Sequence, residues 1–495
     1  MERKLSRRFS VQDAAFLYFE KRNEPLHIGS VAIFEGQVSL DRFVEHLRSR
    51  MHLIPRYRQR VMPVPFGLAY PSWEYDPDFD ILNHVRRVTL PPPGDEDQLA
   101  RLAGDLFAKP LDRRKPLWEI YLIEGVEGGN SAWLAKVHHC LVDGVAGIDL
   151  LMVTLDVSPN PAPPPPAEPL AAPPLPGATT VLSNAVRDLA GDFVRNLGEL
   201  QLNLANPLGY VQRLRHILGA LEATAPLLQR PAPRTPFNTT LTTGRRIAWS
   251  EMSFAEIRGI RSSLGGTIND VVLAIVTGAL GRYLALHGQN TDGLELRLMI
   301  PVNVRREDES TAMGNRISAM FAALPVGIAN PVARLKAIRE KVEGLKQIGQ
   351  AAGVGAVFDL LGSAAPMTLR AVANMARVPN VLLNMVCTNV PGPMIPLYTV
   401  GHRLLAHYPL VPIAWDMGLG VAITSYDQKL YFGLMADAKA VPDIHKLREV
   451  LDEAFVELRE AAGVPPSDLP TLIGRSAAEA TPEPAPETTV ATEAS

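Results

Sequence analysis

The sequence predicts an α/β protein of two globular domains with mixed sheets and flanking helices. Its 495 residues exceed what one small core requires, so two domains of roughly 150–250 residues each are expected. Strand-like and helix-like apolar patterns occur on both sides of a proline-rich stretch at residues 158–176, where ten of nineteen residues are proline. Such a run resists helix and sheet and is typical of an extended linker.

Composition excludes several classes of function. An apolar content of 47% and a charged content of 20% are those of a globular protein, and a net charge of −3 provides no basic field for a nucleic-acid partner. The two cysteines, Cys140 and Cys387, lie outside CxxC or CxxH patterns, which argues against a disulfide framework and favours a reducing cytoplasm. The N-terminus lacks the apolar segment of a signal peptide, so any membrane contact is expected to be peripheral.

The segment H-H-C-L-V-D-G at residues 138–144 is the first candidate site. Residues 133–137 are mostly apolar and predict a buried strand, and residues 145–152 predict the helix that follows it. The two histidines therefore lie at a strand end, on the turn into a helix. Such junctions project side chains from a rigid scaffold into a cleft.

This segment suits the transfer of an acyl group to an alcohol or amine. The attacking group must lose its proton, and a neutral imidazole is matched to that task near pH 7; we assign this general-base role to His139. We expect Asp143 to orient the loop, Gly144 to permit its tight turn, and His138 to be supporting or simply satisfied by local hydrogen bonds. No metal site is expected, because neighbouring side chains on a strand point to opposite faces.

An apolar stripe after the linker predicts a long amphipathic helix. Apolar residues recur there at intervals of three or four, at positions 182, 186, 189, 193, 197, 200 and 204. A similar pattern resumes after Pro207 and continues to Leu221. Core packing of a helix pair and contact with a lipid surface are both compatible with this pattern.

The region from residue 237 to residue 463 mixes helix and strand signals. A capping-box pattern, Thr267-x-x-Asp270, opens a long apolar helix toward Leu286, and Asn269 and Asp270 are expected to be mainly structural. Strands are predicted at residues 296–304, 316–326, 381–388, 418–425 and 430–436, and a closing helix at residues 445–462. The last twenty residues contain no basic and no aromatic side chain and predict disorder.

The histidine segment resembles the H-H-x-x-x-D-G signature of chloramphenicol-acetyltransferase-like enzymes, which include condensation domains and the bacterial wax ester synthase/diacylglycerol acyltransferase family. Further segments resemble the last family specifically, and their order covers nearly the whole chain outside the linker and the tail. They are SVQDAAF at 10–16, PLWE at 116–119, NDVVLA at 269–274, PVNVR at 301–305, GNR at 314–316 and NVPGP at 389–393.

The resemblance implies two chloramphenicol-acetyltransferase-like domains with the active-site channel between them. It implies acyl-CoA as co-substrate without a further cofactor, diacylglycerol or a long-chain fatty alcohol as acceptor, and triacylglycerol or wax ester as product. It also implies peripheral association with a membrane or lipid inclusion. By analogy with condensation domains, Asp143 pairs with an early arginine, for which Arg58 is the nearest match. Asn269 and Asp270 would support the channel wall.

Other interpretations remain open. A condensation-type enzyme that takes acyl groups from a carrier protein and a catalytically silent lipid-surface protein are the alternatives. Arg245 and Arg246 follow Gly244 and are expected either to meet coenzyme A phosphates or to be solvated. The expected units are an N-terminal acyltransferase domain, a proline-rich linker, an amphipathic helical connector, a C-terminal acyltransferase-like domain and an acidic disordered tail, at residues 1–157, 158–180, 181–230, 231–465 and 466–495.

Overall fold

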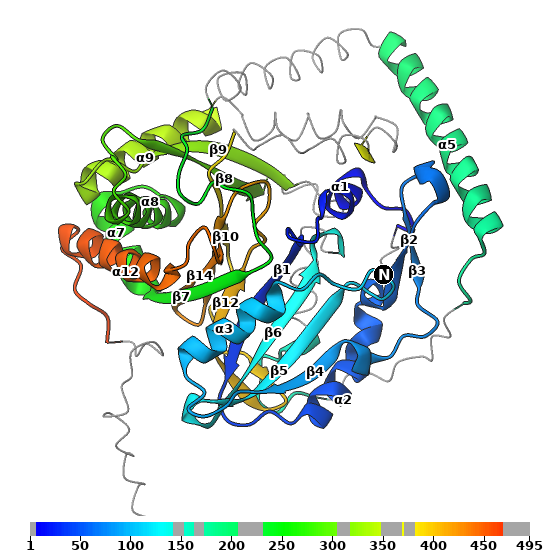
Figure 1. The fold of residues 1–495 in the computed structure, drawn as a ribbon, viewed down its shortest axis with the longest axis horizontal. Helices are drawn as coiled ribbons and strands as arrows, with labels where there is room; N and C mark the ends of the chain where they lie inside the picture. The colour runs from blue at the N-terminus through cyan, green and yellow to red at the C-terminus, as the bar shows by residue number, and fades with distance from the viewer. Residues whose placement is uncertain are drawn as a thin grey trace, which may run out of the picture.

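Two six-stranded sheets organise the part of the chain that the structure describes (Figure 1). A large cluster of buried apolar side chains packs around each of them. The computed structural model describes residues 6–141, 153–162, 173–205, 231–303, 317–347, 369–370 and 382–468. Both sheets contain parallel and antiparallel neighbours. The predicted α/β class with mixed sheets is therefore confirmed.

The first sheet has the order β11-β12-β1-β6-β5-β4. Its central strand β1 runs antiparallel to β6 and β12, and His27 of β1 lies opposite His138 of β6. In the order of the sheet, the strands are Tyr398–Thr399, His402–Leu410, His27–Phe34, Asn130–His138, Trp118–Val126 and Val85–Thr89. Strands β11 and β12 come from the C-terminal half, so the sequence boundary at residue 231 is not a boundary between the two sheets.

Helices α2 (Leu40–Arg50) and α3 (Glu96–Phe107) cover opposite faces of the first sheet. Side chains alternate along a strand, so Trp133 and His138 of β6 point to opposite faces. The ring of Phe43 in α2 lies 5.5 Å from that of Trp133, and the ring of Phe107 in α3 lies 4.4 Å from that of His27. His138 therefore faces the side that α3 covers.

Shorter elements surround this sheet. Helix α1 spans Val11–Phe19, and strands β2 (Gln59–Met62) and β3 (Ser72–Tyr75) form a small separate sheet. The short 3-10 helices η1 to η6 are Met51–Leu53, Pro55–Arg58, Pro65–Gly67, Ile81–Asn83, Glu127–Gly129 and His139–Leu141.

The second sheet has the order β7-β14-β13-β10-β8-β9. These strands are Arg245–Ser253, Lys429–Asp437, Leu419–Tyr426, Met385–Val390, Glu295–Asn303 and Ile317–Pro325. Among the described residues, the helices on one face of it (Figure 1) are Phe254–Leu264 (α7), Ile268–Leu286 (α8), Pro331–Gln347 (α9) and Ile444–Ala461 (α12). The five strands and two helices predicted here are confirmed with shifts of a few residues at their ends.

Helix α8 is apolar because it is the core helix of this layer. By length and composition it is a candidate for crossing a membrane, but 78% of its apolar stretch of 18 residues is buried inside the protein. Its apolar side chains contact the sheet beneath it and the helices beside it. Burial within the protein therefore accounts for its hydropathy.

The two sheets meet where β12 crosses β14. Tyr408 of β12 stacks on Trp249 of β7, with ring centroids 4.9 Å apart, and meets Tyr431 of β14 edge-on at 5.4 Å. A Cβ atom added to Gly433 of β14 would lie 1.7 Å from the carbonyl oxygen of Pro409. Only glycine permits this backbone approach, which joins the two halves of the molecule.

Helix α5 (Ala178–Ala205) confirms the first half of the predicted connector helix. It begins inside the range expected for the linker. Several other predictions lie outside the described residues: the helix at 145–152, the GNR segment, the second half of the connector at 206–230, and the tail beyond residue 468.

Candidate active site

His139 directly follows strand β6, as the sequence predicts. Its backbone N–H donates to the Leu26 carbonyl at 2.9 Å. Its partly buried imidazole stacks on the ring of Phe16, with centroids 3.8 Å apart and planes 10° apart. Phe16 belongs to the SVQDAAF segment, which forms α1. This segment therefore places an aromatic ring against the candidate base.

The environment of His139 keeps its imidazole neutral. Burial lowers the pKa of His139 to about 4, and a charge on neighbouring His138 would lower it further. Desolvation penalises the charged form of a histidine, and Nδ1 is among its buried atoms. At pH 7 the ring is therefore unprotonated and able to accept a proton.

His138 is fully buried and bonded locally. Its Nδ1 accepts a hydrogen bond from the Cys140 backbone N–H at 3.1 Å and lies 2.9 Å from the Cys140 Sγ. A neutral imidazole that accepts at Nδ1 carries its proton on Nε2. That nitrogen lies 3.3 Å from the Oε1 of Glu20. Cys140 is a small buried residue, as predicted, and burial raises the pKa of its thiol well above the ordinary value.

Sequence reasoning missed Glu20, whose side chain is only 5% exposed. Its Oε1 accepts the Leu26 N–H at 3.0 Å, and its Oε2 accepts from Arg113 Nε at 3.2 Å and Nη2 at 2.7 Å. Burial favours a higher pKa for Glu20, but the contacts with His138 and Arg113 outweigh it and lower the pKa to about 2. The available signal was the position of Glu20, one helical turn after Phe16.

The structure brings only part of the predicted site together. Asp143 and Gly144 lie outside the described residues. Arg58 is described, and its guanidinium lies 5.9 Å from the centroid of the Phe79 ring. The expected pairing of Arg58 with Asp143 therefore stays a prediction.

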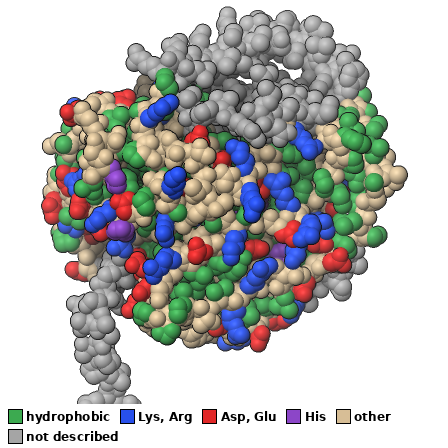
Figure 2. All heavy atoms as spheres, in the orientation of Figure 1, with side chains coloured by type: hydrophobic (Ala, Val, Ile, Leu, Met, Phe, Trp, Pro, Cys, Tyr) green, Lys and Arg blue, Asp and Glu red, His purple; other side chains and the backbone are tan. Residues whose placement is uncertain are grey.

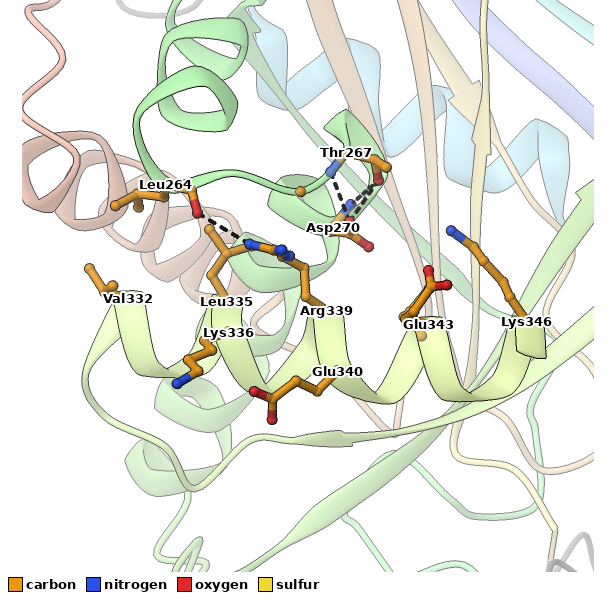
Figure 3. A pocket seen from close by; sticks show the side chains of 12 residues that line it. Leu264, Thr267, Asp270, Val332, Leu335, Lys336, Arg339, Glu340, Glu343 and Lys346 are labelled. Atoms are coloured by element: carbon orange, nitrogen blue, oxygen red, sulfur yellow. Dashed lines mark hydrogen bonds between the residues drawn. The ribbon is translucent and has the colours of Figure 1, made fainter. Parts of the chain in front are cut away.

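Asp270 makes the capping contacts that the sequence predicts, and Asn269 contacts the NVPGP segment. Thr267 and Asp270 form a capping box at the start of α8: the Thr267 Oγ1 accepts the Asp270 N–H at 3.2 Å, and an Asp270 carboxylate oxygen accepts the Thr267 N–H at 2.8 Å (Figure 3). Asn389 Nδ2 donates to Asn269 Oδ1 at 3.4 Å. The NDVVLA and NVPGP segments thus meet at one end of the second sheet.

A groove of about 600 Å³ lies beside this capping box, between α8 and α9. Figure 3 shows Asp270 facing it from α8, with charged side chains of both signs along α9. Among those that line it are Lys336, Arg339, Glu340 and Glu343. Neither histidine of the motif lines this groove.

Two further predictions have clear outcomes. Trp118 is a packing residue, because it is fully buried and its indole N–H donates to the Tyr57 carbonyl at 2.8 Å. Arg245 is neither solvated nor available to a phosphate, because it is buried and lies 3.6 Å from Asp437. Within the described ranges, no group of three or more His, Cys, Asp or Glu residues is arranged to hold a metal ion.

Comparisons with known proteins give matches along most of the chain. The family model described as wax ester synthase/diacylglycerol acyltransferase catalytic domain matches residues 9–272, and the model of the WS/DGAT C-terminal domain matches residues 313–459. A probable diacylglycerol O-acyltransferase of Mycobacterium tuberculosis is 35% identical over 455 residues, which cover 90% of this chain and 94% of the relative. A second one from that organism is 32% identical over 466 residues, covering 91% and 98%.

Solved structures of other proteins have a fold similar to that of this chain. A wax ester synthase/diacylglycerol acyltransferase from Marinobacter aquaeolei has a TM-score of 0.63 at 26% identity and covers 92% of this chain and 100% of that one. The first condensation domain of the calcium-dependent antibiotic synthetase has a TM-score of 0.57 at 16% identity, covering 93% and 98%. The second likeness concerns the fold alone. Both family models, the curated relatives and the fold agree: the chain belongs to the wax ester synthase/diacylglycerol acyltransferase family.

Proposed function

We propose that this protein is an acyl-CoA-dependent O-acyltransferase that esterifies diacylglycerol, long-chain fatty alcohols or both, with His139 as general base. Its products are triacylglycerol or wax esters. The observation that carries the proposal is the neutral, partly buried imidazole of His139 at the end of β6. The names of the relatives support the substrate classes.

The reaction follows from the protonation state of His139. Its Nδ1 is buried, so Nε2 is the nitrogen that meets the acceptor. The imidazole takes the proton of the acceptor hydroxyl while the oxygen attacks the thioester carbonyl. The carbon–sulfur bond of the tetrahedral intermediate then breaks, and the departing thiolate recovers the proton from His139. Protons and electrons balance without a further cofactor.

Ester formation by a His139→Ala variant tests the proposal. The rate of transfer from a long-chain acyl-CoA should fall by ~10²–10⁴, because general-base catalysis contributes that much. His138→Ala should lose less, because His138 is fully buried and contacts Cys140 and Glu20. Retention of the wild-type rate by His139→Ala at unchanged folding would contradict the proposal.

The same assay separates the substrate alternatives. Long-chain alcohols and diacylglycerols offered against one acyl-CoA identify the acceptor. An acyl carrier protein in place of acyl-CoA tests the condensation-type alternative, which predicts faster transfer from the carrier. A folded protein that is inactive with every donor and acceptor would instead support a catalytically silent lipid-surface protein.

We further propose that α5 rests on a membrane or lipid inclusion on the cytoplasmic side. Leu182, Val186 and Leu189 of its apolar stripe are 39%, 57% and 37% exposed, while Val181 and Ala185 form its buried side. Core packing of this part of the stripe is therefore contradicted. Phe66, in the η3 segment that contacts α5, is 85% exposed. Figure 2 shows hydrophobic side chains gathered at this edge of the molecule.

Flotation with lipid vesicles tests the α5 proposal. Val186→Glu places a charge on the exposed stripe and should weaken vesicle binding by about tenfold, because burying a valine is worth roughly 1.5 kcal/mol. Asn184→Glu is the matched control, since it adds the same charge on the side where Asn184 already accepts from Arg187. Equal binding by the two variants would remove α5 from the membrane contact.

A further inference from the structure

Helix α1 faces both histidines of the motif with residues one turn apart. Phe16 stacks on the His139 imidazole, and Glu20, the C-cap residue of α1, lies against His138. Residues four apart lie on the same side of a helix. One helix end therefore touches the candidate base and the residue before it.

The Glu20 carboxylate contacts two residues, Leu26 and His138, that in turn contact the backbone of the His139 turn. On one side, Glu20 Oε1 accepts the Leu26 N–H at 3.0 Å, and the Leu26 carbonyl accepts the His139 N–H at 2.9 Å. On the other side, Glu20 Oε1 lies 3.3 Å from His138 Nε2, and His138 Nδ1 accepts the Cys140 N–H at 3.1 Å. Glu20 Oε1 is thus connected to the His139 amide through Leu26, and to the Cys140 amide through His138.

The second oxygen of this carboxylate is held separately. Arg113 donates to Glu20 Oε2 through Nε and Nη2, and its Nη2 also donates to the Leu17 carbonyl at 2.8 Å. Both donors converge on one oxygen, so they fix the position of Oε2 rather than pairing with both oxygens. Because Arg113 anchors Oε2, Oε1 remains available to Leu26 and His138.

We propose that Glu20 is a positioning residue for His139, acting through Leu26 and His138 to hold the turn that presents the base. This inference rests on the proposed function of His139. A base must be held close to its productive geometry, and small displacements cost large factors in rate. Glu20 itself does not contact the substrate in this scheme.

Glu20→Gln tests the inference, because glutamine preserves the shape and can still accept the Leu26 N–H, but loses the charge. We expect kcat to fall about 10- to 100-fold, in the range seen when the partner that orients a functional histidine is removed. The KM for acyl-CoA should change little. Glu20→Asp keeps the charge and should recover part of the lost kcat, with melting temperatures measured for both variants.

The matched control is Glu251→Gln on β7. Glu251 is also a buried carboxylate, with an ion pair to Lys429 at 3.4 Å, and it belongs to the second sheet, whereas His138 and His139 lie at the end of β6 in the first. Its substitution should lower the melting temperature without the loss of kcat. Equal losses of kcat in Glu20→Gln and Glu251→Gln would show a general stability effect and overturn the inference.

A double variant separates this inference from the proposed function. If Glu20 acts through His139, Glu20→Gln should cost nothing further in a His139→Ala background, because residues that act as a unit are not additive. A full additional loss there would overturn the positioning role while leaving His139 as the base. Should Glu20→Gln fail to fold, the same comparison with Glu20→Asp decides the question. Wild-type activity of His139→Ala alone would instead overturn the proposed function.

Discussion

The ring of Phe16 stacks on the His139 imidazole and so contributes to the burial that lowers the pKa of His139. Burial holds the pKa of His139 near 4, and the Phe16 ring covers one face of the imidazole at 3.8 Å. Replacing that ring by a methyl group would admit water and favour the charged form. We therefore expect Phe16→Ala to raise the pKa of His139 toward the ordinary value of about 6.5.

The pH dependence of kcat/KM measures this shift. The base works only when unprotonated, so the wild-type rate should be lost as the pH falls through about 4. In Phe16→Ala the loss should begin at higher pH, and activity near pH 5 should fall more than activity near pH 8. Phe19→Ala on the same helix is the control, because Phe19 packs edge-on against Trp415 instead. A pH profile of Phe16→Ala that matches the wild type would contradict the role of the ring.

At the same scale, the sequence could predict that His139 lies at a strand end, but not which side chains from other parts of the chain contact the motif. The motif places two histidines and Cys140 in a row, and a strand end followed by a turn is a local pattern. Glu20 and Arg113 reach the motif from other parts of the chain, and only the folded backbone brings them together. A charged residue after a helix pattern is also common on protein surfaces, so the sequence could not mark Glu20 as buried.

At the scale of elements, local sequence patterns predicted whether many segments form a helix or a strand. The capping box of α8, the closing helix α12 and five strands of the second sheet were visible in the sequence pattern, but its edge strand β7 was not predicted. Spacing indicates which face is buried but not which strand lies alongside. Strand β12 is an example: its burial alternates along the strand, but that alternation does not reveal that it pairs with β1. Its place in the first sheet was therefore not predictable from the pattern.

At the scale of the whole molecule, β12 joins the two sheets and so sets how the two halves sit together. It hydrogen-bonds along β1 and contacts β14 and β13 of the other sheet. The N-terminal half also reaches across near the candidate site, where the Glu24 carboxylate accepts the Trp415 N–H at 2.9 Å. Any channel between the halves depends on this crossing, because the sheets that would form its walls meet there.

Gly433→Ala tests whether stability and activity depend on the close contact between β12 and β14. The added Cβ would lie 1.7 Å from the Pro409 carbonyl oxygen, so the two sheets must separate or tilt. Overpacking of this kind costs about 1–3 kcal/mol or more. We expect a lower urea midpoint and a fall in kcat/KM, since a shift between the sheets displaces elements of both halves. Gly344→Ala is the control, because Gly344 lies within α9 and a Cβ added there would have no neighbour within 4 Å. Alanine at this position should stabilise the helix by roughly 0.5–1 kcal/mol. Equal urea midpoints and equal activity in Gly433→Ala and the wild type would show that the halves do not depend on close contact at β12.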